Sequence, residues 1–108
     1  MSKQELYKAT LRKLGVLDAD ATPSDADTTI CAEAWEELAT DLGISSAYIP
    51  NGAGLHIANV LAADLCDDFQ VDEMRVQRFL NMRQRNIHKI MSGVNQDYDY
   101  PVIEGDFY

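Results

Sequence analysis

Apolar side chains recur at helical spacing in four segments of this sequence, and this pattern limits the chain to an all-helical fold. The segments cover residues 3–14, 23–42, 55–69 and 72–92. Positions three and four apart lie on one side of an α-helix, so each segment predicts a helix with one buried face. The length of 108 residues fits one domain. We therefore expect an all-α, four-helix bundle-like domain over residues 1–92, followed by a separate C-terminal segment.

Capping residues mark the ends of the first two predicted helices. Ser2 and Glu5 have the spacing of a capping box, in which each side chain accepts a backbone N–H bond from the other residue. Gly15 follows the last turn, where a left-handed residue closes a helix. We expect the second helix to start at Pro23 with Thr22 as its N-cap, and to end before the next glycine of the chain.

The third segment is the most apolar of the four, which predicts that it lies at the centre of the bundle. Its expected buried face holds Leu55, Ala58, Leu61, Ala62, Leu65, Cys66 and Phe69. The two cysteines, Cys31 and Cys66, each lie within an apolar helical pattern. Free cysteine is among the residue types that are most often buried, so we expect two reduced, buried thiols.

The fourth segment carries a charge within its apolar face. That face is expected to hold Val76, Phe79, Leu80, Ile87, Ile90 and Val94. At about 100° per residue, Arg83 points into the middle of it. Two interpretations stay open: a side chain that reaches solvent at the bundle edge, or a paired charge at a subunit interface. A buried guanidinium needs a carboxylate, such as Asp64, Asp68 or one from a neighbouring copy, because an unpaired buried charge is costly.

Charge is segregated along the chain, which has a formal net charge of -9. Between Leu14 and Met74 there are thirteen Asp and Glu residues and no Lys or Arg. The nine basic residues form two blocks, which are Lys3, Lys8, Arg12 and Lys13, and then Arg75, Arg78, Arg83, Arg85 and Lys89. In the second block, the residues expected on one side of the helix with Met82 are Arg75, Arg78, Arg85 and Lys89. Such segregation is typical either of solvated helix faces or of electrostatic complementarity between copies or with a partner.

The last sixteen residues, 93–108, have no helical period. Tyr98, Tyr100 and Val102 alternate with polar residues or proline, a pattern typical of an extended strand. We expect an arm that docks on another subunit through six anchors, which are Tyr98, Tyr100, Val102, Ile103, Phe107 and Tyr108. The alternative is a frayed terminus.

No residue pattern indicates an active site, so we expect a protein that is not an enzyme and has no catalytic residue, metal or cofactor. His56 and His88 are isolated, and there is no H-E-x-x-H or C-x-x-C motif. Asp18 could open a calcium loop, but Pro23 stands where that loop needs glycine.

The net charge argues against nucleic-acid binding as the primary role. No membrane-spanning run or signal-peptide pattern is present, so we expect a protein made and kept in a cytosol.

Two runs of the sequence resemble a known family. The first is ATLRKLGV at residues 9–16, which is followed by an Asp-rich loop and an acidic helix that contains Trp35. The second is IPNGAGLHIANVLAADLC at residues 49–66. Together they resemble the head-completion proteins of short-tailed phages, which are also called tail accessory factors or packaged-DNA stabilisation proteins. The resemblance extends from about Lys3 to Ser92, with the same order of four helices.

This resemblance implies a virion protein at the head–tail interface, assembled from subunits made in the host cytoplasm. A dodecameric ring of such head-to-tail adaptors lies under the portal protein, joins it to a tail tube or nozzle, and helps to retain packaged DNA, with at most passing DNA contact. The arm would then dock on the portal. The charges expected at subunit interfaces or facing the channel are Arg75, Arg78, Arg83, Arg85 and Lys89.

Two rival functions stay open beside the adaptor. One is an acidic regulatory binding module, such as a phage-encoded inhibitor or a DNA mimic that binds a basic partner. The other is a small hydrolase, because one member of the family was assigned muralytic activity. No residue pattern in this chain carries that activity over.

Overall fold

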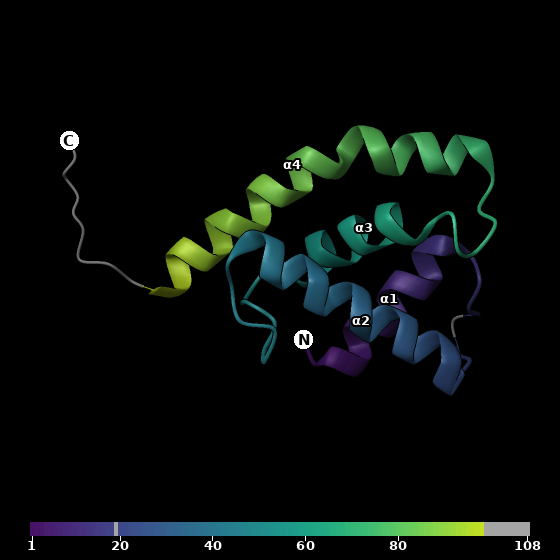
Figure 1. Cartoon of the computed structure of the whole chain (residues 1–108), viewed down its shortest axis with the longest axis horizontal. Coiled ribbons are helices and arrows are strands. Elements are labelled where there is room, and N and C mark those ends of the chain that lie inside the picture. Colours follow the sequence, from purple (N-terminus) through teal and green to yellow (C-terminus); the bar gives the residue numbers. More distant parts are fainter. Residues whose placement is uncertain (19, 99–108) are drawn as a thin grey trace.

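The computed structural model describes residues 1–18 and 20–98, and these residues form four α-helices and no strand. The helices are α1 (Lys3–Leu14), α2 (Asp25–Leu42), α3 (Gly54–Leu65) and α4 (Glu73–Tyr98) (Figure 1). The side chains are described as far as Val94. This confirms the prediction of an all-α domain built from four helices in a bundle-like arrangement.

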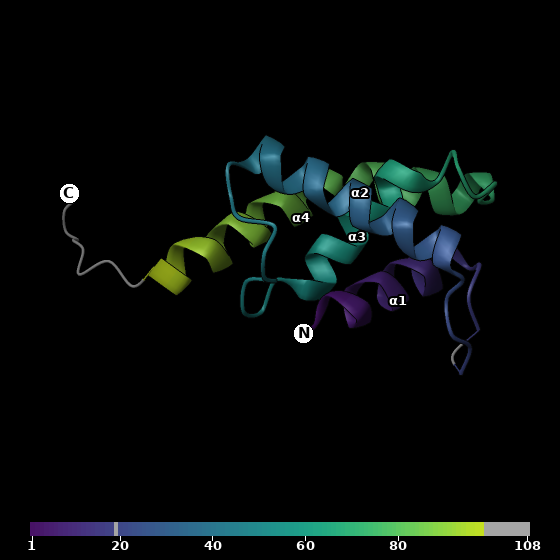
Figure 2. The same ribbon diagram turned by 60° about the horizontal axis from the view of Figure 1, so that its bottom comes forward.

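Helix α3 is the central element, as its composition predicts. It packs against each of the other three helices, and Figures 1 and 2 both place it between α4 and α1. Ile57, Val60 and Leu61 have no exposed surface at all. The prediction that Leu55 is buried is wrong, since 59% of it is exposed. Leu55 lies in the first turn of α3, which begins at Gly54.

The end of α3 and the start of α2 both differ from the predicted bounds. Helix α3 ends at Leu65, because the chain then turns and reaches a left-handed residue at Gln70 (φ 53°), so Phe69 lies outside the helix. Helix α2 starts at Asp25, with Ser24 as its N-cap in place of Thr22. The Ser24 hydroxyl accepts a bond from the Asp27 N–H at 3.1 Å, which satisfies one of the free donors of the first turn.

Helix α1 has the ends that the sequence predicts. Ser2 Oγ accepts from the Glu5 N–H at 3.1 Å, and Glu5 Oε1 accepts from the Ser2 N–H at 2.7 Å. The bond from the Ser2 backbone N–H is the main reason why the pKa of Glu5 is lowered. Gly15 adopts the left-handed conformation after the last turn, with φ 79°. The predicted face of this helix, Leu6, Tyr7, Thr10, Leu11 and Leu14, is buried.

Helix α4 begins beside Asp72, whose Oδ1 accepts from the Arg75 N–H at 3.0 Å, and it continues to Tyr98. The predicted end at Ser92 is therefore wrong, and the predicted boundary between residues 92 and 93 falls inside the helix. Val94 is buried, so the apolar face continues past Gly93. A Cβ at Gly93 would lie 3.3 Å from the carbonyl oxygen of Asn51, so the glycine allows α4 to pass close to this loop.

The apolar face of α4 is narrower than predicted. Phe79, Ile90 and Val94 are buried, whereas Leu80 is 50% exposed, so the prediction of a buried Leu80 is wrong. Leu80 lies at the edge of this face, about 80° around the helix from Ile90. Within the ranges 1–18 and 20–98, no helix has the length and apolar character needed to cross a membrane.

Candidate functional site

A groove of about 430 Å³ lies between the C-terminal end of α1 and the first half of α4, with α3 contributing to its lining. Its lining residues, which we call the basic groove, are Arg12, Lys13, Asn59, Arg75, Arg78, Phe79, Met82 and Asn86. The fold thus brings together members of the two basic blocks that are more than 60 residues apart in the sequence. Four cations converge on one hollow of a protein whose net charge is -9.

The local backbone explains why these cations gather there. The carbonyl groups at the C-terminal end of α1 carry a partial negative charge, which favours Arg12 and Lys13 in the last turn. Arg75 of α4 lies directly over Gly15, since a Cβ at Gly15 would overlap Arg75 Nη1. The nearest counter-charge among the described ion pairs is Asp72, whose Oδ2 is 3.9 Å from Arg75 Nε. Four of the eight lining residues are cations, so the groove is positively charged.

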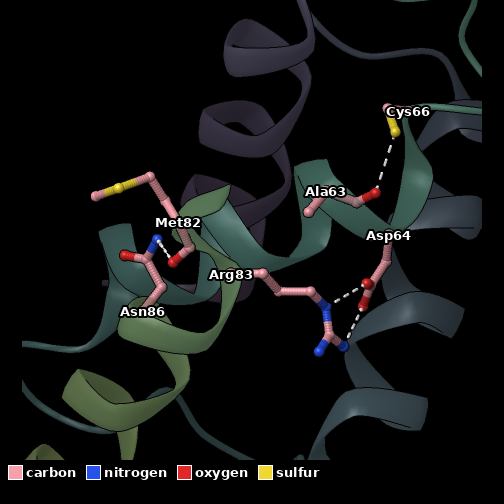
Figure 3. A network of polar contacts seen from close by, with 6 residues as sticks. All are labelled: Ala63, Asp64, Cys66, Met82, Arg83 and Asn86. Carbon is pink, nitrogen blue, oxygen red and sulfur yellow. Dashed lines mark hydrogen bonds and ion pairs between the residues drawn. The ribbon is translucent and has the colours of Figure 1, made fainter. Parts of the chain in front are cut away.

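A buried amide, Asn86, is one of the residues that line the groove. Asn86 is only 5% exposed, and its Oδ1 accepts from Asn59 Nδ2 at 3.2 Å. The same oxygen lies 3.0 Å from His56 Nδ1. Asn86 Nδ2 donates to the Met82 carbonyl at 2.9 Å (Figure 3). Since the amide oxygen is an acceptor, His56 must carry its proton on Nδ1. The bonds to His56 and Asn59 join α4 to α3 beside the groove.

Arg83 points away from the basic groove and pairs with Asp64 of α3. Arg83 Nε donates to Asp64 Oδ1 at 2.8 Å, and Nη2 donates to Oδ2 at 3.3 Å. The hydrogen bond to Asp64 is the main reason why the pKa of Arg83 is raised, and the negative charge of Asp41 adds to the rise. Figure 3 shows Arg83 on one side of α4 and Met82 with Asn86 on the other. The carboxylate that the sequence requires is therefore Asp64 of the same chain, at the half-exposed edge of the bundle.

Breaking this pair is expected to cost only about 1 kcal/mol of folding free energy, because both side chains are about one-third exposed. We predict this loss for Asp64→Asn, Arg83→Gln and the double variant alike, so that the two single losses do not add. Urea unfolding followed by circular dichroism measures each value. Asp68→Asn is the matched control, since Asp68 forms no ion pair with a described Lys or Arg residue. Fully additive losses would contradict a coupled pair.

A second charged surface lies on α2. Its exposed side carries Glu33, Glu36, Glu37, Thr40 and Asp41 around a shallow hollow, and we call these residues the acidic ridge. None of its carboxylates forms an ion pair with a Lys or Arg of the described chain. The helix therefore presents four exposed carboxylates to solvent.

The structure divides the predicted charge stripe of α4 into two parts. Arg75 and Arg78 line the basic groove, whereas Arg85 and Lys89 are exposed outside it. Arg83, which was predicted outside the stripe, is paired on another side of the helix. The sequence reasoning missed Arg12, Lys13, Asn59 and Asn86 as groove residues. The two basic blocks of the sequence were a usable signal for Arg12 and Lys13. Nothing in the sequence indicated that Asn59 and Asn86 would line the groove.

Five of the six predicted docking anchors lie outside the residues that the structure describes. Tyr98 is the last residue of α4 and not part of an extended strand, so the predicted strand conformation is wrong at this position. The other five anchors, Tyr100, Val102, Ile103, Phe107 and Tyr108, lie outside the described residues. Their docking role stays a prediction.

Both cysteines are free and buried, as the sequence predicts. Burial raises the pKa of Cys31 to about 11, and it also raises the pKa of Cys66. A thiol with a pKa this high is almost fully protonated near neutral pH and is a poor nucleophile. Across residues 1–18 and 20–98, no group of three or more His, Cys, Asp and Glu side chains could hold a metal ion.

Comparison of the chain with protein-family models, with curated proteins and with solved structures gave no match.

Proposed function

We propose that this protein is a structural virion component, a head-to-tail adaptor that forms a ring under the portal, connects it to the tail and helps to retain packaged DNA. One observation carries the proposal. A single small domain has a basic groove lined by four cations and an acidic ridge with four carboxylates, and the two surfaces lie on different helices. The sequence resemblance supplies the identity of the assembly.

Two unlike surfaces on one subunit suit a ring. When a surface of one copy binds a different surface of the next, the contact repeats around the assembly and closes if the rotation allows. Two-fold dimers instead need one self-complementary surface, which neither the groove nor the ridge provides. A domain that acted only as a monomer would have no need of both surfaces.

The acidic regulatory module is the alternative that a specific observation favours. The exposed carboxylates of the acidic ridge would suit a basic partner protein. That function leaves the basic groove without a role, and for this reason the adaptor is the stronger proposal. A stable monomer that binds a basic host protein and ignores the portal would favour the module.

The decisive experiment mixes the purified protein with the portal protein of the same phage and images the product by electron microscopy. We expect a ring of adaptor density on the portal. We also expect a variant that lacks residues 99–108 to lose docking, because this segment holds five of the six predicted anchors. The deletion starts at Asp99 and not at Gly93, since Val94 belongs to the buried core.

Circular dichroism and thermal unfolding provide the control for the deletion. The shortened protein should keep its helical signal and its melting temperature, because no described core residue is removed. Full docking without residues 99–108 would refute the arm as an anchor. A wild-type protein that never binds the portal would reject the adaptor function itself.

A further inference from the structure

We propose that the basic groove of one copy binds the acidic ridge of the next copy, so that α2 of each subunit seats between α1 and α4 of its neighbour. This inference rests on the proposed ring and names the two surfaces that build it. The partner is a second copy of this chain. In the contact, the carboxylates on one side of α2 bind the guanidinium and ammonium groups that line the groove of the neighbouring copy.

The charges of the two surfaces match in number and in length. Four cations line the groove, and four carboxylates lie on the ridge. From Arg75 to Asn86, the groove follows eleven residues of α4, or about 16 Å of helix. From Glu33 to Asp41, the ridge follows eight residues of α2, or about 12 Å. The ridge is therefore shorter than the stretch of α4 that lines the groove.

The two surfaces cannot bind each other within one chain. The groove opens on the side of α4 that carries Met82 and Asn86, and Arg83 leaves the helix on another side (Figure 3). Asp41 of the ridge acts on Arg83, and so the ridge lies toward the Arg83 side. Since groove and ridge face different ways, a ridge that fills the groove must come from another copy.

The same separation lets each subunit use both surfaces at once. A stable interface covers about 800 Å² on each partner. Two such interfaces would take about a quarter of the 6556 Å² surface of the chain. A subunit that is engaged on both sides still has most of its surface left for the portal and the tail. The groove also offers Phe79 and Met82 as apolar contact between its cations.

A pair of charge reversals tests the contact. In Arg78→Glu the groove is damaged and the ridge is intact, whereas in Glu37→Lys the ridge is damaged and the groove is intact. Both side chains are exposed, so folding should be unaffected. At low salt, sedimentation of the wild-type protein should show a mass that rises with concentration. Each variant alone should associate at least about tenfold more weakly.

The mixture of the two variants gives the sharpest result. The intact ridge of Arg78→Glu should bind the intact groove of Glu37→Lys, which yields a one-to-one dimer and nothing larger. Isotope-labelled Arg78→Glu, titrated with unlabelled Glu37→Lys, should show amide shifts confined to α2. Arg85→Glu and Asp67→Lys are the matched controls, since they make the same charge changes outside both surfaces and should associate as the wild-type protein does.

Several outcomes would overturn this contact. They are a wild-type protein that stays monomeric without concentration-dependent shifts, an Arg78→Glu variant that associates normally, and a mixture that stays monomeric. Binding of a short DNA duplex that Arg78→Glu abolishes, without any dimer in the mixture, would assign the groove to nucleic acid instead. A portal ring that forms normally with Arg78→Glu would reject the groove–ridge contact and leave the adaptor function standing. If the wild-type protein forms no ring on the portal but the mixture forms the dimer, the adaptor function would be rejected and the groove–ridge contact would stand.

Discussion

Trp35→Ala is expected to lower the free energy of unfolding by about 3–5 kcal/mol, the largest effect of any single change that we predict. Trp35 is 1% exposed and is the largest fully buried side chain of the core. Its indole Nε1 also donates to the Ser46 carbonyl at 3.0 Å, which ties the loop after α2 to the helix. Alanine would leave a cavity and an unpaired carbonyl at once. The free energy of unfolding of a domain of this size is about 5–15 kcal/mol in total, so the variant would be close to unfolding.

The measurement is urea unfolding followed by circular dichroism, because the substitution removes the only tryptophan and hence its fluorescence. Trp35→Phe keeps most of the buried ring and loses the N–H donor, so it should cost about 1–2 kcal/mol. Glu36→Ala, on the exposed side of the same helix, should change stability by less than about 0.5 kcal/mol. A loss below about 1 kcal/mol for Trp35→Ala would show that Trp35 is not a core residue.

The helices and the core were predictable because their signals are local. The apolar period, the capping box at Ser2 and the glycine after Leu14 each act within one or two turns, and the structure has all three. The errors arise where two local signals compete. Thr22 and Ser24 can both cap a helix, and the chain uses Ser24, which also places Pro23 before the cap.

The end of α4 was mispredicted because glycine is an ambiguous signal. A glycine inside a helix costs about 1 kcal/mol relative to alanine, and it often marks a boundary. At Gly93 this cost is offset by tertiary packing, since Val94 is buried and the loop at Asn51 approaches the glycine. The contact involves residues more than 40 positions apart, so no local pattern predicts it.

The candidate site was predictable only in part, for the same reason. Arg75 and Arg78 were expected on one side of their helix, and that much follows from the helical period. Their meeting with Arg12 and Lys13 depends on how α1 and α4 pack on α3, which one helix alone does not determine. The partner of Arg83 could be narrowed to a few residues from the sequence. A buried charge is costly unless it is paired, so Arg83 was expected to contact one of a small set of carboxylates that includes Asp64.

Asn86→Ala is expected to lower the free energy of unfolding by about 2 kcal/mol and to weaken the basic groove. The amide of Asn86 makes hydrogen bonds to His56, Asn59 and the Met82 carbonyl, and it is buried at the α3–α4 contact. Removing it leaves the donors of His56 and Asn59 without their acceptor, which costs more than the net value of the bonds themselves. The loss of stability stays modest because His56 and Asn59 are half-buried and water can reach them.

Asn81→Ala is the matched control, since Asn81 is an exposed asparagine of the same helix and should change stability by less than about 0.5 kcal/mol. Chemical unfolding gives both values, and the mixing experiment with Glu37→Lys gives the effect on the groove. If α4 is held on α3 by this amide, Asn86→Ala should lose stability and dimer formation together, although it changes no charge. Loss of dimer formation at unchanged stability would instead place Asn86 in direct contact with the neighbouring ridge. Unchanged stability with normal dimer formation would contradict its role as the link between the fold and the groove.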